Sequence, residues 1–194
     1  MLQSLLQLDH QLFHLVNHTL ANPVFDVLCR VLRGKTFLIL FYLLMALRLF
    51  QLYPQRFLMV AAGGALCFLL TDQLSASFIK PLFHRLRPCN NAAVEARLLA
   101  DYCGAGFSFV SAHAANSFGM AAFLSVMFKD RFREILILFA WAALVSFSQV
   151  YVGVHYPLDV FGGALLGLVT GGLVAAAMRY VSFKRADKGK KQIH

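Results

Sequence analysis

The stretch LDVFGGALLGLVTGGLVAAAMRY occupies residues 158–180 and decides the class of fold. Its charged residues are Asp159, next to the start, and Arg179, next to the end, and between them lie only apolar and small side chains with one threonine. A helix needs about 20 mainly apolar residues to cross a bilayer, and its backbone groups must be satisfied within the helix because lipid offers no partners. The stretch therefore predicts a membrane-spanning helix.

Four further apolar runs precede this one, so the chain predicts five membrane-spanning helices. The five runs are Thr36–Phe50, Phe57–Ser77, Phe109–Phe128, Ile135–Val152 and Leu158–Tyr180. The first run is short, and we expect it to extend toward Gly34 or past Arg48, whose side chain can reach the membrane surface. The predicted fold class is an all-α polytopic membrane helical bundle over residues 34–181.

Composition supports a membrane protein and excludes other classes. The 194 residues are 59% hydrophobic and only 14% charged, with a mean hydropathy of +0.66. A soluble fold of this size lacks the interior to hide so much apolar surface, which argues against a water-soluble enzyme, a disordered chain and a secreted disulfide scaffold. The formal charge of +9 is divided among short connections, which fits a membrane protein better than a nucleic-acid-binding protein.

The N-terminal residues 1–33 predict helices that lie in the membrane interface. Leucine and phenylalanine recur near helical spacing over residues 2–16, but glutamine, aspartate and histidine interrupt them. Asn22-Pro23 ends this helix, and residues 24–32 form a second amphipathic stretch. In an alternative interpretation residues 1–20 form a sixth span, which their internal polar residues disfavour.

The charges of the connections predict an orientation. Connections 48–56 and 129–133, together with the C-terminal end from Arg179, carry eleven Lys and Arg residues. Residues 30–35 and 80–97, on the other side of the predicted membrane, carry seven. Cytoplasmic loops are richer in Lys and Arg, so we expect residues 182–194 to form a basic cytoplasmic tail.

The first of three polar clusters is Lys80-Pro-Leu-Phe-His-Arg-Leu-Arg87-Pro88. Lys80 and Arg87 are seven residues apart, two helical turns, and would face the same way if the second span continued past the membrane surface. Two cations on one face can bind an anion. Alternatively, they only anchor the helix at the membrane surface.

The second cluster, Val110-Ser-Ala-His113, opens the third span. A hydroxyl and small residues at a helix start leave backbone N–H groups and the positive end of the helix dipole available to an anion. An ionisable residue such as His113 at membrane depth is a functional candidate. In the alternative interpretation Ser111 only caps the helix, although one hydroxyl can cap and also bind a ligand.

The third cluster runs from Ser148-Gln149 to His155 and Asp159. Asp159 is four residues after His155, so its carboxylate can accept a hydrogen bond from ring Nδ1 and leave Nε2 free. A buried structural pair is the alternative. Five spans put all three clusters on one side, where cations and donors would suit a phosphate dianion. The spacings typical of metal sites do not occur in the sequence, and we expect no metal.

Together the clusters resemble the signature of the type 2 phosphatidic acid phosphatase superfamily, whose members include bacterial membrane lipid phosphatases. The family pattern is Lys-x6-Arg-Pro, then Pro-Ser-Gly-His, then Ser-Arg-x5-His-x3-Asp. Order and spacing agree over residues 80–159, with Val110 in place of proline and Ala112 in place of glycine.

The resemblance implies a helical membrane phosphatase that forms a phosphohistidine intermediate and needs no metal or other cofactor. Carried over to this sequence, His155 is the nucleophile on phosphorus and Asp159 orients its ring. His113 is the acid that protonates the leaving oxygen and then the base that activates water. The groups implied to hold the phosphoryl oxygens are Lys80, Arg87, Ser111, the Ala112 N–H and the residue at position 149.

Position 149 is the main departure from the family pattern, because Gln149 stands where the family has arginine. Glutamine donates hydrogen bonds but neutralises no charge. The loss of one charge-assisted contact is expected to cost about 2–4 kcal/mol of transition-state stabilisation. Arg85 is the residue that we expect could compensate.

The connection that carries the first cluster also contains Cys89 and Cys103. The implied location is the bacterial inner membrane, with the site facing the periplasm. Two cysteines in an oxidising compartment predict a disulfide that holds this loop over the site.

We predict an enzyme that hydrolyses a lipid-linked phosphate or pyrophosphate, because a site at the membrane surface lets the lipid chain stay in the bilayer. The candidate substrates by resemblance are undecaprenyl pyrophosphate, lipid A phosphates, phosphatidylglycerol phosphate and phosphatidic acid. A catalytically weakened binder of phospholipid headgroups is the alternative, motivated only by Gln149. A transporter is disfavoured because the polar residues gather at one end. The oligomeric state is left open.

Overall fold

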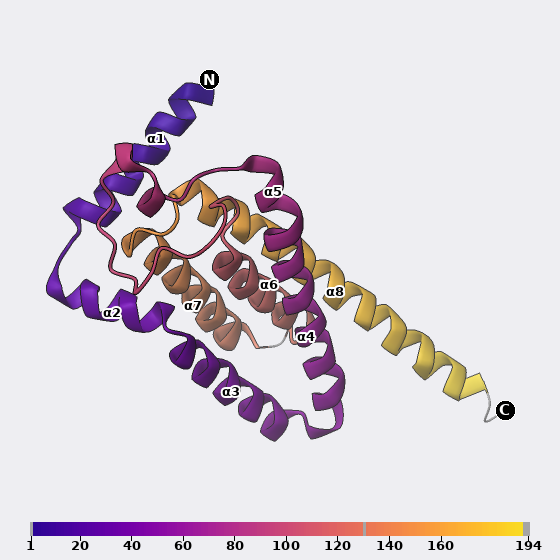
Figure 1. The fold of residues 1–194 in the computed structure, drawn as a ribbon. Coiled ribbons are helices and arrows are strands. Elements are labelled where there is room, and N and C mark those ends of the chain that lie inside the picture. Colours follow the sequence, from indigo (N-terminus) through magenta and orange to yellow (C-terminus); the bar gives the residue numbers. More distant parts are fainter. Residues whose placement is uncertain (1, 130, 192–194) are drawn as a thin grey trace.

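The computed structural model describes residues 2–129 and 131–191, and no β-strand occurs among them. The elements are helices joined by short turns and one long loop (Figure 1). The α-helices are α1 (Leu2–His14), α2 (Pro23–Arg33), α3 (Lys35–Leu52), α4 (Phe57–Gln73), α5 (Lys80–Phe83), α6 (Ala112–Met127), α7 (Phe132–Tyr151) and α8 (Pro157–Lys191). The shorter helical segments are η1 (Leu15–Thr19), η2 (Pro54–Arg56), η3 (Leu74–Ile79), η4 (Pro88–Asn90) and η5 (Ala92–Val94).

The all-α membrane bundle predicted from hydropathy is confirmed. Four helices in the described residues are long and apolar enough to cross a membrane: Lys35–Leu52, Pro54–Phe83, Arg133–Tyr151 and Pro157–Val181. The remaining predicted span corresponds to α6, which has 16 residues and packs against α4, α7 and α8. Because other helices surround α6, most of its side chains contact protein and not lipid. Its length of 16 residues therefore does not show by itself that it crosses the membrane. Five membrane crossings therefore stay a prediction.

A row of glycines on α8 lets this helix approach α6 closely. Gly163, Gly167 and Gly171 are spaced by four residues and face α6. A Cβ at Gly167 would lie 2.3 Å from the Ala115 carbonyl oxygen, and one at Gly171 would lie 2.1 Å from that of Gly119. The small residues therefore pack two helices of the same chain, as small residues commonly do in membranes. This contact holds the first turns of α6 and α8 together.

The second predicted span continues beyond Ser77 through η3 into α5. It ends at His84, which adopts a left-handed conformation with φ of 47°. Lys80 therefore lies on the helix, whereas Arg87 follows it in extended backbone before Pro88. The expectation that both cations share one helix face is wrong, because the turn at His84 ends the helix between them.

The N-terminal segment forms the two helices predicted, and Asn22 caps the second by accepting a hydrogen bond from Phe25 N–H at 2.9 Å. Residues 2–19 are not among the four candidate spans of the described chain. A polar side chain of this segment instead forms hydrogen bonds with the end of α7 and with the long loop. Buried Asn17 donates to the carbonyl oxygens of Tyr151, at 2.8 Å, and Arg97, at 2.9 Å, and accepts from Arg97 N–H. An interfacial location for these helices stays a prediction.

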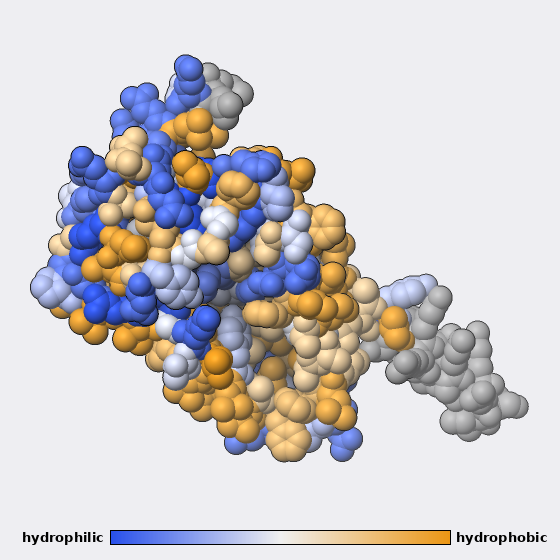
Figure 2. All heavy atoms as spheres, viewed as in Figure 1, coloured by the Kyte–Doolittle hydropathy of each residue, from blue (hydrophilic) through white to orange (hydrophobic). Residues whose placement is uncertain are grey.

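The surface divides along the same lines as the fold. Hydrophilic residues gather over the N-terminal helices and the long loop, whereas hydrophobic residues cover much of the body of the bundle (Figure 2). Helix α8 runs away from the loop end and continues through Lys191, past the predicted start of the tail at residue 182. Residues 192–194 of that tail lie outside the described residues.

The long loop between α5 and α6 is closed by a disulfide between Cys89 and Cys103, whose Cα atoms lie 5.8 Å apart. We expect reduction of this bond to lower the free energy of unfolding by about 3 kcal/mol, because the bond closes a loop in the unfolded chain. The measurement is thermal unfolding in detergent with and without reductant, alongside a Cys89→Ser/Cys103→Ser variant that reductant should leave unchanged. Free thiols at both positions in freshly purified protein would contradict the expectation.

Candidate active site

The predicted site residues come from different helices and lie at one end of the bundle. Helices α4 and α7 run toward this end, and α6 and α8 start there (Figure 1). The first turns of α6 and α8 are joined by a hydrogen bond of 2.9 Å from Ser111 N–H to the Asp159 carbonyl oxygen. The alternation of helix direction therefore brings the second and third polar clusters together.

His155 lies in the tight turn between α7 and α8 and is buried. The carbonyl oxygen of Gln149 accepts hydrogen bonds of 3.2 Å from the N–H groups of Val154 and His155. Gly153 has φ of 86°, and a Cβ there would lie 2.7 Å from the Arg97 carbonyl oxygen, so the turn requires glycine. The turn is thus built to present one imidazole.

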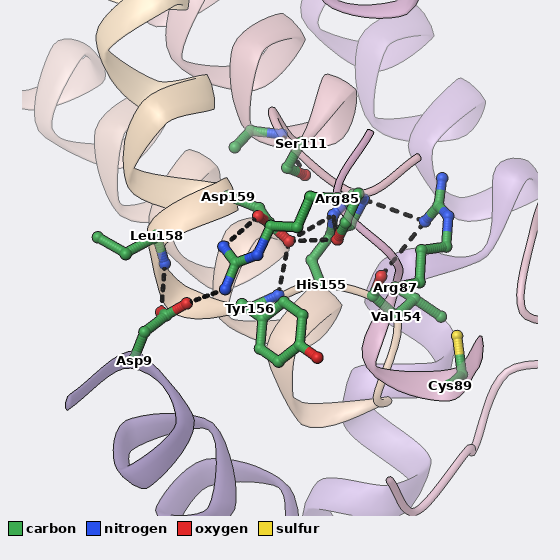
Figure 3. A network of polar contacts seen from close by, with 12 residues as sticks. Asp9, Arg85, Arg87, Cys89, Ser111, Val154, His155, Tyr156, Leu158 and Asp159 are labelled. Carbon is green, nitrogen blue, oxygen red and sulfur yellow. Dashed lines mark hydrogen bonds and ion pairs between the residues drawn. The ribbon is translucent and has the colours of Figure 1, made fainter. Parts of the chain in front are cut away.

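The two ring nitrogens of His155 have different partners (Figure 3). Nδ1 lies 3.4 Å from Asp159 Oδ2 and 3.4 Å from Ser108 Oγ. Nε2 lies 3.3 Å from Nη1 of Arg87, whose other contacts are to backbone carbonyl oxygens. A ring that donates from Nδ1 to the carboxylate keeps its Nε2 lone pair on the side of the Arg87 cation. An anion held by Arg87 would lie against this nitrogen.

Asp159 is held from several directions and occupies the third position of α8. Its Oδ2 accepts from Tyr156 N–H at 2.8 Å, which caps the helix, and also from Ser108 Oγ. Its Oδ1 accepts from Arg85 Nη1 at 2.7 Å. Because these bonds fix both oxygens, the buried carboxylate can hold the His155 ring in one orientation.

Arg85 binds two buried carboxylates, Asp159 and Asp9 (Figure 3). Asp9 comes from α1, and its Oδ1 also accepts from Leu158 N–H, in the first turn of α8, at 2.8 Å. The Arg85 guanidinium carbon lies 4.0 Å from the centre of the Tyr156 ring. The expectation that Arg85 compensates for Gln149 is therefore not supported, because this cation neutralises carboxylates on the Asp159 side of His155.

Burial controls the charge state of the site. Desolvation lowers the pKa of His155 to about 4, and the positive charges of Arg87 and Lys80 act in the same direction, while Asp159 opposes them. Desolvation also lowers the pKa of Arg87, but an arginine keeps its charge near neutral pH. At pH 7 the site therefore presents a neutral imidazole beside a guanidinium, which suits nucleophilic attack on a phosphate.

The start of α6 carries the second cluster. Ser111 is buried and caps the helix, accepting from Ala114 N–H at 3.5 Å. His113, the second residue of α6, lies within electrostatic reach of His155, Lys80 and Arg87. The capping interpretation of Ser111 is thus met, and it is compatible with a site at the same helix end.

Gln149 lies at the end of α7 and is buried. Its Nε2 donates to Ser148 Oγ at 3.3 Å, and its Oε1 has no hydrogen-bond partner among the described residues. Within the described residues the Gln149 side chain forms no hydrogen bond with Arg87 or His155, and an amide supplies no charge. The charge of the family arginine is therefore missing at this position.

Sequence reasoning missed Ser108 and Asp9 as parts of the site. Both are buried polar residues that contact Asp159, directly or through Arg85. The sequence contains one indication for Asp9, which is an acidic residue within an otherwise apolar helix pattern. It contains no indication for Ser108, because serine is common in loops rich in small residues. No group of three His, Cys, Asp or Glu residues arranged for a metal occurs in residues 2–129 and 131–191.

We expect Ser108→Ala to lower kcat about tenfold with little change in KM, because Asp159 loses one of its donors and His155 is oriented less firmly. Ser108→Thr keeps the hydroxyl and should retain most of the activity. The measurement is phosphate release at saturating substrate from purified protein in detergent. Equal kcat for the alanine variant and the wild type would show that Ser108 is dispensable.

Comparisons with known proteins show the family to which the chain belongs. The model of the PAP2 superfamily matches residues 57–183. The chain is 34% identical over 171 residues to a "Lipid A 4'-phosphatase" of Bacteroides thetaiotaomicron, covering 86% of this chain and 75% of that protein. It is 29% identical over 182 residues to a protein of the same name from Porphyromonas gingivalis, covering 92% of this chain and 76% of that protein.

Two solved structures share the fold. The crystal structure of Aquifex aeolicus LpxE superposes with a TM-score of 0.64 at 28% identity, covering 84% of this chain and 92% of that chain. A PAP2-type phosphatidylglycerolphosphate phosphatase from Bacillus subtilis superposes with a TM-score of 0.69 at 21% identity, covering 92% and 88% of the two chains, and supports the fold alone. With the family model matched over most of the bundle, the chain belongs to the PAP2 superfamily and is a multi-pass membrane phosphatase.

Proposed function

We propose that this phosphatase removes a phosphate monoester from lipid A through a phosphohistidine on His155, without a metal ion. The observation that carries the lipid part of this proposal is the position of His113, which lines both an apolar groove and a polar pocket. A lipid chain in the groove would place its headgroup beside the imidazole. The relatives named lipid A 4'-phosphatase support the choice of lipid.

The apolar groove has a volume of about 600 Å³ and lies between α3, α4 and α6. Leu38, Ile39 and Leu43 line it from α3, and Phe68 lines it from α4. Helix α3 has no buried residue and makes few contacts with the rest of the bundle, so the groove is bounded on one side by a loosely packed helix. Such a groove suits a hydrocarbon chain that enters from the membrane.

The proposed reaction has two steps. Nε2 of His155 attacks phosphorus, the bond from phosphorus to the lipid oxygen breaks, and His113 donates a proton to that oxygen. Water then gives a proton to His113 and attacks the phosphorus, the P–N bond breaks, and inorganic phosphate leaves with His155 restored. In both steps Lys80 and Arg87 stabilise the charge on the phosphoryl oxygens. The Ser111 hydroxyl and the Ala112 N–H, at the start of α6, donate hydrogen bonds to the same oxygens.

The test is a panel of lipid A, undecaprenyl pyrophosphate, phosphatidylglycerol phosphate and phosphatidic acid, assayed for phosphate release with excess chelator. We expect the highest kcat/KM for lipid A and no loss of activity with chelator. Mass spectrometry of the product identifies which phosphate was removed. A preference for the pyrophosphate would contradict the proposed substrate, and dependence on a metal would contradict the proposed chemistry.

We also propose that the site faces the periplasm of the bacterial inner membrane and that the C-terminus is cytoplasmic. The disulfide lies at the site end, and the C-terminal end of α8 lies at the opposite end with the connections rich in Lys and Arg. A C-terminal green fluorescent protein fusion should be fluorescent and a C-terminal alkaline phosphatase fusion inactive. The reverse pattern would overturn this orientation.

A further inference from the structure

The site lacks one positive charge relative to the family pattern. Gln149 carries none, and Arg85 is bound to two carboxylates. Lys80 and Arg87 therefore remain as the motif cations available to a phosphate dianion. Since phosphoryl transfer depends mainly on charge stabilisation, a third cation near His113 would have a large effect.

Arg33 is a cation in the right place, although it lies outside both the motifs and the matched family region 57–183. It is the last residue of α2, at the site end of the bundle. With His113, Tyr102 and Val152 it lines a polar pocket of about 380 Å³. Its charge acts on both His113 and Arg87. Arg33 thus belongs to the same electrostatic environment as the predicted catalytic residues.

The Arg33 side chain has unused binding capacity. Its Nε is buried without a hydrogen-bond partner, and the guanidinium forms no salt bridge with any described residue. Asp101 and Tyr102 line the same pocket, and the guanidinium carbon lies 6.0 Å from the centre of the Tyr102 ring. A half-buried guanidinium with an unpartnered donor is stabilised when an anion enters its pocket.

We propose that Arg33 binds the phosphate group of the lipid substrate and supplies the positive charge that Gln149 lacks. Helix α2 then completes the phosphate site from outside the family motifs. The ligand is the phosphoryl group under attack, held between Arg33 on one side and Arg87 on the other, with its leaving oxygen toward His113. This inference rests on the proposed function, since it concerns the same site.

The first test compares Arg33→Gln with Arg33→Lys. We expect Arg33→Gln to lower kcat/KM for lipid A about 100-fold, while Arg33→Lys, which keeps the charge but not the fork of donors, loses about tenfold. The inhibition constant of inorganic phosphate should rise with Arg33→Gln, because phosphate uses the same cation. Arg56→Gln, directly before α4 and at the end of the bundle away from the site, is the matched control and should match the wild type. Arg33→Gln within threefold of the wild type would overturn the proposal.

The second test asks whether Arg33 substitutes for the missing arginine. Gln149→Arg should raise kcat/KM at least about tenfold more in the Arg33→Gln background than in the wild type. Equal gains in both backgrounds would mean that the two positions act independently, which contradicts the proposal. If Gln149→Arg does not fold, the inhibition constants of inorganic phosphate for the Arg33 variants test the proposal instead. An inhibition constant of Arg33→Gln equal to that of the wild type would then contradict it.

The failure of this inference is distinguishable from that of the proposed function. An active wild type that His155→Ala inactivates and Arg33→Gln leaves unchanged rejects Arg33 and keeps the phosphatase. A wild type that releases no phosphate from any lipid rejects the proposed function. In that case, binding of inorganic phosphate by wild type and Arg33→Gln, measured by calorimetry, still tests Arg33, and equal affinities would reject it.

Discussion

Replacement of His155 by alanine is expected to lower phosphate release at least about 10³-fold, because it removes the proposed nucleophile on phosphorus. Nε2 of this ring lies 3.3 Å from the Arg87 guanidinium, where a bound phosphate would be held. Burial keeps the imidazole neutral, so its lone pair is available. The measurement is turnover of lipid A together with trapping of ³²P-labelled enzyme in acid quench and alkaline quench.

The trapped species distinguishes the mechanism. A phosphohistidine is labile in acid and stable in base, whereas a phosphoserine is stable in acid. We expect base-stable label on the wild type and none on His155→Ala. His14→Ala changes an exposed histidine of α1 and is the matched control, which should label normally. Label on the His155 variant, or activity within tenfold of the wild type, would exclude His155 as the nucleophile.

Replacement of Arg85 by glutamine is expected to destabilise the protein by about 3–5 kcal/mol, because it leaves two buried carboxylates without their cation. Asp9 and Asp159 are both almost fully buried, with exposed fractions of 2% and 0%. Asp9 also caps the first turn of α8 through Leu158 N–H. The loss of Arg85 should therefore loosen both α1 and the turn that carries His155.

The measurement is thermal unfolding in detergent of Arg85→Gln, Asp9→Asn and the double variant. The double variant should recover part of the stability lost in Arg85→Gln, because one of the stranded charges is gone. Asp9→Asn should lower kcat with little change in KM if Asp9 positions Asp159 through Arg85. A melting temperature of Arg85→Gln equal to that of the wild type would show that the network contributes little.

The sequence predicted the helical class and the motif residues because both are local patterns. Hydropathy over residues 158–180 is sufficient for a membrane helix, since lipid permits few other structures. The spacing from His155 to Asp159 is set within one turn and the start of one helix, and the structure places the two side chains in contact. An alternation of helix direction then put residues 80–113 and 148–159 at one end of the bundle.

The sequence predicted the positions of some side chains wrongly, where turns or contacts between distant segments determine those positions. Lys80 and Arg87 were expected on one helix face, but the left-handed residue His84 ends the helix between them. Arg85 was the residue that could compensate for Gln149, but it binds Asp159 and also Asp9, which is 76 residues away in the chain. A spacing rule describes neighbours along one helix and contains no information about a partner from another helix.

The sequence by itself thus determined that the chain is a membrane helical bundle with a phosphatase signature at one end. Only the tertiary structure decided that the N-terminal helices reach the candidate site, where Asp9 binds Arg85 behind the His155–Asp159 pair and Arg33 lines a pocket with His113. The physical reason is the range of the interactions. Hydropathy and helical spacing act within about 20 residues, whereas the pairing of buried charges depends on which helices pack together, and that is settled only when the whole chain has folded.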